Sequence, residues 1–171
     1  MKRNLSKISL LKIMLALSLL LLSCVISGCG EKSVEKLAVG TSIQTGDWNV
    51  TLNSFNITKT ISSAFGKLPA KTDKSFILID VSFENLSSTT KLAGFENIIP
   101  AITTSKSGYY IVHDEAYQIV DDYFVFGYVD GGKTVRGILP FELPNSASDI
   151  DFTLSVDGKD LVWTLKEGLL R

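Results

Sequence analysis

From residue 37 onward the sequence predicts an all-β fold, an antiparallel β-sandwich. Three observations carry this prediction. Apolar and polar residues alternate in several short stretches, turn-type Gly, Asn and Asp residues separate those stretches, and no stretch shows convincing helical periodicity. Short strands at regular spacing over about 130 residues are typical of two packed sheets. A closed barrel built from the same strands is the structural alternative.

The first long strand is expected to begin at Trp48, directly after the turn-type residues 45–47. Apolar and polar residues alternate over 48–52, and the apolar phase then slips at Phe55 and Ile57. One extra residue in a strand produces such a slip, so the sequence predicts a β-bulge at this point.

Two more strands are expected in the middle of the chain. Apolar residues alternate over 77–83, and the stretch ends in turn-type residues that begin at Asn85. Residues 135–143 form another extended run, and the glycines before it predict a hairpin turn at 130–133.

The clearest strand pair lies at the end of the chain. Residues 150–156 and 161–165 both alternate, and Asp157-Gly158 between them is a typical two-residue hairpin turn. Trp48 and Trp163 occupy apolar positions of their strands, so we expect both indoles in the core between the sheets.

The N-terminus predicts an export signal. Residues 1–12 carry four basic side chains and no acidic one, and the next fourteen residues, 13–26, are uncharged and mostly apolar. A membrane-spanning helix needs roughly 20 apolar residues, whereas this length suits the apolar region of a signal peptide. We therefore expect residues 1–28 to form a signal helix ahead of the sandwich, with a permanent transmembrane helix as the alternative.

The residues after this stretch resemble a bacterial lipobox. Ile26-Ser27-Gly28-Cys29 has an aliphatic residue, two small residues and then a cysteine. The resemblance implies that Cys29 becomes the first residue of the mature protein and carries a thioether-linked lipid. It further implies anchoring in a bacterial cell membrane on the extracytoplasmic face, with 29–36 as a lipidated tether and 37–171 as the domain. Secretion after cleavage at another site is the alternative.

The charge balance and the cysteines exclude several classes of function. Without residues 1–28 the chain keeps 13 basic and 18 acidic side chains, so the folding part is acidic and no nucleic acid is expected as a partner. Of the two cysteines, Cys24 leaves with the signal and Cys29 is modified by lipid. We therefore expect no disulfide, no cysteine-based catalysis and no cofactor in the mature domain.

Several short motifs, taken in order, resemble the telokin-like, immunoglobulin-like sandwich domain of unknown function found in Gram-positive lipoproteins. They are Gly46-Asp47-Trp48, the strand 79–85, Gly108-Tyr109-Tyr110, the turn 131–133, the strand 137–144 and the final Leu161-Val162-Trp163. The resemblance implies an immunoglobulin-like surface module with no assigned reaction. Ser105 stands where the family usually has Asp, which weakens any inference of a turn-capping or cation-binding carboxylate there.

Catalytic constellations are hard to assemble from this composition. His113 is the single histidine, and a Ser-His-Asp triad built on it would lack a nucleophile elbow. Asp121 and Asp122 are paired carboxylates, but adjacent strand residues point to opposite faces. We expect the protein not to be an enzyme, and a surface hydrolase using these carboxylates is the alternative.

One stretch has an unusual composition and is the first candidate ligand surface. No cation lies between Lys106 and Lys133, and all five tyrosines fall in this stretch. The candidate ligand residues are Tyr117, Asp121, Asp122 and Tyr123. If these side chains are exposed, they would suit binding of a sugar or a cationic peptide. In the alternative, the aromatic side chains fill the core and the acidic side chains face water. Calcium is a further candidate, although no calcium-loop spacing is present.

A second candidate surface is the lysine-rich stretch 59–74, which includes Lys67 and Lys71. Its length exceeds that of a typical hairpin loop. We expect either a solvated, mobile loop or a contact with anionic lipid headgroups or polymers. The predicted function is thus non-catalytic binding or presentation to an unknown envelope protein or polymer, or to an extracellular partner. A protease-inhibitor-like or immunomodulatory module is the alternative within binding.

Overall fold

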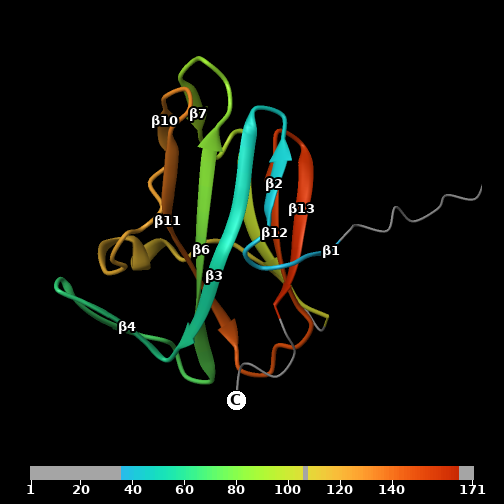
Figure 1. The fold of residues 1–171 in the computed structure, drawn as a ribbon. Helices are drawn as coiled ribbons and strands as arrows, with labels where there is room; N and C mark the ends of the chain where they lie inside the picture. The colour runs from blue at the N-terminus through green and yellow to red at the C-terminus, as the bar shows by residue number, and fades with distance from the viewer. Residues whose placement is uncertain (1–35, 106–107, 166–171) are drawn as a thin grey trace, which may run out of the picture. The chain divides into compact units, whose positions relative to one another are not determined.

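The computed structural model describes residues 36–105 and 108–165, which form two facing β-sheets (Figure 1). One sheet has the strand order β11-β6-β3-β2, and the other has the order β1-β13-β12-β8-β9. The predicted all-β sandwich is therefore confirmed. The predicted signal helix, Cys29 and the tether up to residue 35 lie outside the described residues.

The four-stranded sheet is antiparallel throughout, and β6 is one of its two central strands. Its members are β2 (Ser42–Thr45), β3 (Trp48–Thr58), β6 (Lys74–Asn85) and β11 (Thr134–Pro144). The pairing of β3 with β6 shifts register between Leu52 and Ser54, which confirms the predicted bulge.

The five-stranded sheet contains one parallel pair, β1 with β13. Its members are β1 (Lys36–Leu37), β8 (Ile98–Thr103), β9 (Tyr109–Tyr110), β12 (Ile150–Val156) and β13 (Lys159–Leu165). Asp157 and Gly158 join β12 to β13 with φ angles of 50° and 77°, as a two-residue hairpin turn requires. The predicted terminal hairpin is confirmed.

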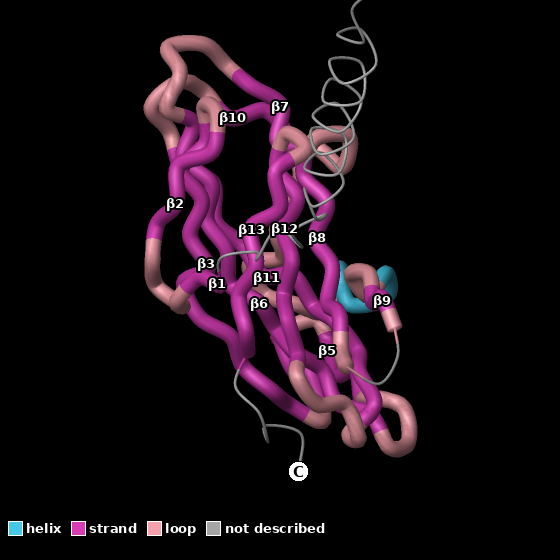
Figure 2. The backbone as a smooth tube through the Cα atoms, turned by 90° about the vertical axis from the view of Figure 1, so that its right-hand side faces the viewer, coloured by secondary structure: helices cyan, strands magenta, loops and turns pink. Residues whose placement is uncertain are grey.

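Two small strand pairs and a short helix complete the described part of the chain. The pairs are β4 (Thr60–Ser63) with β5 (Gly66–Pro69), and β7 (Lys91–Ala93) with β10 (Gly127–Val129). The 3₁₀ helix η1 (Asp114–Gln118) lies beside β9 (Figure 2). Within the two described ranges, no helix is long and apolar enough to cross a membrane.

Two sequence predictions about connections were wrong. Residues 59–74 contain the β4–β5 hairpin, which projects at the side of the sandwich, where a solvated loop was expected (Figure 1). The turn at 130–133 joins β10 to β11. Because β10 pairs with β7 and β11 pairs with β6, the two strands beside the turn do not pair with each other, and the turn is not a hairpin turn. In both cases the pairing depends on residues far along the chain.

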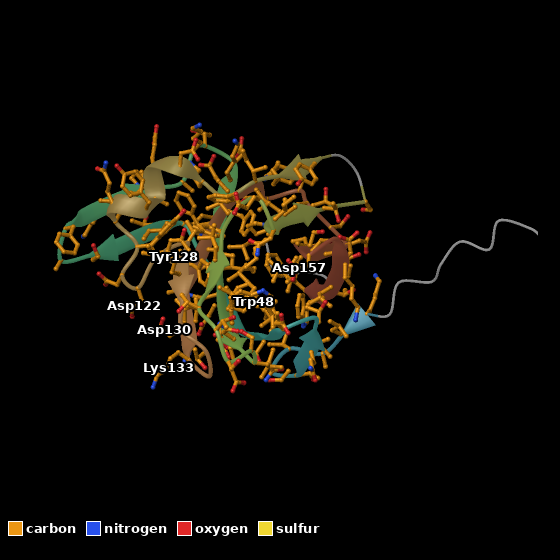
Figure 3. All side chains as sticks on the ribbon, turned by 90° about the horizontal axis from the view of Figure 1, so that it is seen from above. Trp48, Asp122, Tyr128, Asp130, Lys133 and Asp157 are labelled. Carbon is orange, nitrogen blue, oxygen red and sulfur yellow. The ribbon has the colours of Figure 1, made fainter. Side chains whose placement is uncertain are left out.

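Large aromatic side chains fill the space between the sheets. Trp48 and Trp163 are 1% and 0% exposed, which confirms that both indoles are in the core, and Figure 3 shows Trp48 inside the sandwich. Phe141 of β11 meets Phe152 of β12 edge to face at 5.9 Å between ring centroids, so the contact joins the two sheets.

A second, smaller core covers the outer face of the four-stranded sheet. Phe76 on β6 points away from the main core, yet it is fully buried. Ile61 of the β4–β5 hairpin, together with Ala116 and Val120 around η1, covers it. The hairpin and η1 are therefore held by apolar burial on the sheet.

The segment 122–126, here called the crossing segment, runs against β11 and enters the main core. The backbone N–H of Phe124 donates to the carbonyl of Ile138 at 3.0 Å, and the N–H of Ile138 donates to the carbonyl of Asp122 at 2.8 Å. A Cβ atom at Gly137 would lie 2.4 Å from the Cα of Phe124. Only glycine at this position leaves room for the crossing segment.

We predict that Gly137→Ala lowers the free energy of unfolding by about 1–3 kcal/mol, because the added methyl overlaps backbone and not a movable side chain. Urea unfolding followed by tryptophan fluorescence measures this change. Gly127→Ala is the matched control, since a Cβ there meets nothing within 4 Å. Equal effects of the two substitutions would show that the approach of Phe124 does not constrain the fold.

Candidate functional site

The surface carries an apolar groove of about 690 Å³ beside β8. Its walls come from the turn before β8, from β8 itself, from the segment between β9 and η1, from η1, and from the crossing segment. The lining is mainly aliphatic and aromatic and consists of Phe95, Ile99, Pro100, Ile111, Val112, Asp114, Tyr117, Tyr123, Phe124, Val125 and Phe126.

Several of the lining side chains are largely open to solvent. The exposed fractions are 71% for Val125, 64% for Ile111, 59% for Phe95 and 56% for Tyr117. A single exposed apolar side chain is ordinary, whereas a group of them around one concave surface marks an interaction site. The groove is therefore the candidate binding site of the domain.

A chain of aromatic contacts ties the groove to the main core. Ring centroids lie 6.2 Å apart for Trp48 and Phe83, 5.2 Å for Phe83 and Phe124, and 4.9 Å for Phe124 and Phe126. Phe126 then meets Phe95 at 3.9 Å on the groove wall. Because the inner rings are fixed by close packing, this wall is held in shape by the core.

Asp114 is the only carboxylate of the groove lining, and none of the described lining residues is basic. Burial, and secondly the negative charge of Asp114, raises the pKa of the Tyr123 phenol above its ordinary value. The exposed carboxylates of Glu96 and Glu115 follow lining residues directly in the chain. The groove thus combines apolar walls with negative charge, and its described lining supplies no cation to balance that charge.

The structure brings only part of the predicted ligand surface together. Tyr117 and Tyr123 both line the groove, and their rings meet edge to face at 6.4 Å. Asp122 lines a second, polar hollow with Asp80 and Arg136, at the periphery of the sandwich (Figure 3), and Tyr123 lines both this hollow and the groove. Asp121 lines a third hollow, beside β4.

The assumption that Asp121 and Asp122 are neighbouring strand residues was wrong. Both lie in a turn, and Asp122 has a φ of 57°, the left-handed conformation that Asp tolerates better than most residues. The two carboxylates still face different surroundings, because they line different hollows.

Sequence reasoning missed most of the groove wall. Phe95 and Ile99 were not candidates, and neither were Ile111 and Val125. The available signal was two runs without polar alternation, 109–112 and 123–126, which fit neither a half-exposed strand nor a polar loop.

His113 lines a shallow hollow with Asp114 and Glu115. Its ring packs edge-on against Phe76 at 5.4 Å, and its buried Nδ1 atom has no hydrogen-bond partner among the described residues. In the same part of the chain, no group of three or more His, Cys, Asp or Glu side chains is placed to hold a metal ion.

The lysine-rich stretch is a smaller positive surface than the sequence indicates. Lys59 donates to the carbonyl of Lys74 and to the side chain of Asn145, and the Lys74 ammonium pairs with Glu142 at 3.0 Å. Lys67 and Lys71 are exposed, but the structure does not place them in the groove with the tyrosines.

Glu142 holds the return of the hairpin to the sheet. One carboxylate oxygen accepts the backbone N–H of Lys71 at 2.7 Å and the other accepts the Lys74 ammonium, while the residue is only 9% exposed. Burial acts to raise the pKa of Glu142, but the two donors together outweigh it and hold the pKa below its ordinary value.

Fold and site together define a β-sandwich domain with an open apolar groove. Residues 37–164 match the family described as Domain of unknown function (DUF4352), and the chain belongs to this family. A search of curated proteins gave no significant match.

Solved structures with the same fold come from Clostridium difficile and Bacillus subtilis. An uncharacterized β-sandwich protein from Clostridium difficile 630 superposes with a TM-score of 0.57 at 18% identity, covering 80% of this chain and 97% of that one. The yjhA protein from Bacillus subtilis has a TM-score of 0.57 at 17% identity, with 75% and 98% covered. The "putative lipoprotein (ycdA)" of Bacillus subtilis has a TM-score of 0.50 at 10% identity, with 77% and 39% covered. At these identities the likeness shows the fold alone.

We predict that Glu142→Gln lowers the free energy of unfolding at pH 7 by about 1–3 kcal/mol, because an amide cannot pair with the Lys74 ammonium. Since the folded-state pKa is lowered, the contribution of the carboxylate is present above the unfolded-state value and is lost as the pH falls through the folded-state value. The difference in free energy of unfolding between the unmodified protein and Glu142→Gln should therefore become smaller as the pH falls from about 5 to about 3.

Denaturant unfolding at a series of pH values checks this prediction. Glu96→Gln is the control, because Glu96 is an exposed carboxylate on the loop before β8. A difference in free energy of unfolding that stays constant down to about pH 3 would contradict the role given to the Glu142 charge.

Proposed function

We propose that the protein is a lipid-anchored, extracytoplasmic binding protein whose sandwich holds an apolar segment of an envelope or extracellular protein without catalysing a reaction. The apolar groove carries this proposal. Its exposed side chains have no described part of the chain packed over them, although burying them would be favourable by roughly 25 cal/mol per Å² of apolar surface. A complementary partner surface supplies that burial.

The anchor rests on the sequence of the N-terminus. Residues 1–28 have the layout of an export signal and end in the lipobox-like Ile26 to Cys29. Two or three acyl chains on Cys29 give stable membrane attachment. The first described strand begins at Lys36, so the tether keeps the sandwich within about 20–25 Å of the bilayer. The lipoprotein description of ycdA is in keeping with this placement.

The absence of catalysis is proposed from the chemistry of the groove. Asp114 is the one carboxylate of the groove lining, and the paired carboxylates Asp121 and Asp122 belong to other hollows. A carboxylate-dependent hydrolase needs two carboxyl groups facing one substrate. We also propose that the sandwich is of the telokin-like, immunoglobulin-like type, which supports a surface module that contacts other proteins.

The first prediction from this proposal concerns the anchor. Cys29→Ala should leave an unprocessed precursor without lipid, because the thiol is the group that takes up the diacylglyceryl chain. Metabolic labelling with an alkyne fatty acid and the migration of the chain on gels measure both properties. Cys24→Ala is the matched control and should be processed and labelled normally. Lipid labelling of the Cys29→Ala chain would overturn the anchor.

The second prediction concerns the groove. A photoreactive benzoylphenylalanine at position 125, in the full chain on bacterial cells, should form a crosslinked protein adduct. The same residue at position 128 should not, although Tyr128 is 79% exposed and Val125 is 71% exposed. Only position 125 should crosslink, because Val125 lines the groove and Tyr128 does not.

A further substitution makes this test specific for the groove. Ile111→Lys, on another part of the lining, should abolish the adduct formed from position 125. Equal crosslinking from positions 125 and 128, or an adduct that survives Ile111→Lys, would contradict the groove as the binding site.

A further inference from the structure

The β4–β5 hairpin ends in an exposed apolar tip. Its strands pair up to Ser63 and Gly66, and the two turn residues between them are Ala64 and Phe65. Two-residue hairpin turns usually carry Asn, Asp or Gly, so this turn is apolar where polar residues are the rule. Phe65 is 80% exposed, and Figure 1 shows the hairpin projecting from the sandwich. The phenyl ring therefore adds little burial to the fold of its own chain.

The base of the hairpin is fixed, so the tip has a defined position. Ile61 is 4% exposed in the second core, and at the open end of the hairpin the N–H of Ala70 donates to the carbonyl of Lys59 at 2.8 Å. Within the turn, the N–H of Phe65 donates to the hydroxyl of Ser63 at 3.1 Å. An ordered tip loses little conformational freedom on binding. The hairpin thus presents its apolar tip, already ordered, to a concave partner surface.

The hairpin is also positively charged. Residues 60–72 include Lys67 and Lys71 and no acidic side chain, and both lysines are exposed. Among the described residues, neither ammonium belongs to an ion pair. Lys71 has Glu142 nearby, whose carboxylate accepts its backbone N–H, whereas Lys67 lies two residues beyond Phe65 in β5. Lys67 is therefore the cation that accompanies the tip into a contact.

The groove has the opposite charge and the same apolar character. Phe95 and Val125 offer exposed apolar side chains, and Asp114 is the one charged residue of its described lining. Glu96 and Glu115, which follow lining residues in the chain, add exposed carboxylates. The groove volume of about 690 Å³ lies within the range of about 300–1,000 Å³ that is typical of ligand pockets. It therefore has room for the tip of a hairpin.

One contact between two copies would cover both surfaces. Within one copy they do not meet, because Phe65 is exposed and is not part of the groove lining. An anionic membrane surface would accept the tip and its lysines, but it would leave the groove open and offer nothing to Asp114. A different protein in the groove would leave the tip uncovered. A second copy buries the exposed apolar side chains of both surfaces and pairs their opposite charges.

We infer that the partner in the groove is a second copy of this chain, whose hairpin tip enters with Phe65 against the aromatic wall and Lys67 toward Asp114. This inference rests on the proposed function and names its partner. Each copy has one tip and one groove, so two copies form a reciprocal pair or several form a head-to-tail row. A tip buries less area than a standard protein interface, so the contact is strengthened when anchored copies share one membrane surface.

The test uses two full-length copies with different tags, expressed together in bacterial cells. One copy carries benzoylphenylalanine at position 65, which keeps an aromatic ring at the tip. Illumination should produce an adduct that carries both tags, and mass spectrometry of its digest should place the crosslink on a residue of the groove lining in the second copy. The same photoreactive residue at position 128 should give no such adduct, although Tyr128 is 79% exposed.

Variants of the second copy locate the contact. Val125→Lys should reduce the adduct from position 65 about tenfold or more, because a charged side chain then lies among apolar ones. Tyr128→Lys, at an equally exposed position outside the lining, should leave the adduct unchanged. Asp114→Lys should lower the adduct several-fold. Lys67→Glu in the first copy should then restore most of it, since the two opposite charges are exchanged.

The absence of a two-tag adduct from position 65 would overturn the inference, whether that position labels lipid, another protein or its own copy. An adduct that survives Val125→Lys, or one that Lys67→Glu does not restore, would overturn it too. The photoreactive residue at position 125 decides the proposed function separately. An adduct from there with a different protein would overturn the inference and keep the groove as a binding site, whereas no adduct from there would contradict both.

Discussion

The close approach of Phe124 to Gly137 is the contact on which the rest of the structure depends. Phe124 can enter the core only because residue 137 of β11 has no side chain to occupy that place. The entry fixes the crossing segment along β11 through two backbone hydrogen bonds, and it places Tyr123, Val125 and Phe126 along one wall of the groove. A strand position that looks unremarkable thus determines both a fold contact and a candidate binding surface.

The aromatic contacts that begin at Phe124 explain how a surface groove keeps a defined shape. Phe124 is buried and touches Phe83 inward and Phe126 outward, and Phe126 in turn stacks with Phe95. A wall supported from the core loses little conformational freedom when a ligand binds. The entropic cost of binding is therefore small, and it offsets less of the free energy gained by burying apolar surface. The groove is therefore suited to a partner that supplies apolar side chains in an ordered segment. Phe124 and Val112 belong both to the main core and to the groove lining, so core packing and groove shape depend on the same side chains.

The parts of this molecule that could be predicted from sequence are those that local patterns determine. Alternation placed Trp48 and Trp163 in the core, a phase slip located the bulge after Leu52, and Asp157-Gly158 specified a turn, because each depends on a few consecutive residues. The groove could be predicted only in part. Tyr117 and Tyr123 belonged to a stretch of unusual composition, but Phe95 and Ile99 come from elsewhere in the chain and meet them only through the sheet order. The hairpin within 59–74 escaped prediction for a similar reason, since the burial of Phe76 and Ile61 in a second core depends on η1, which comes much later in the chain, at Asp114–Gln118.

The β8 edge shows how the fold protects a strand whose partner β9 covers only part of it. An open sheet edge invites pairing with other chains, and proteins protect such edges by shortening strands or by placing proline on them. Here β9 covers only Ile102 and Thr103, while Pro100 and the turn bond of Ile98 remove every donor from the next part of the edge. Ile98 is only 1% exposed, so burial protects this part of the edge as well. An edge without free donors cannot pair with another strand, so the domain limits unspecific association through its strands while its apolar groove stays open.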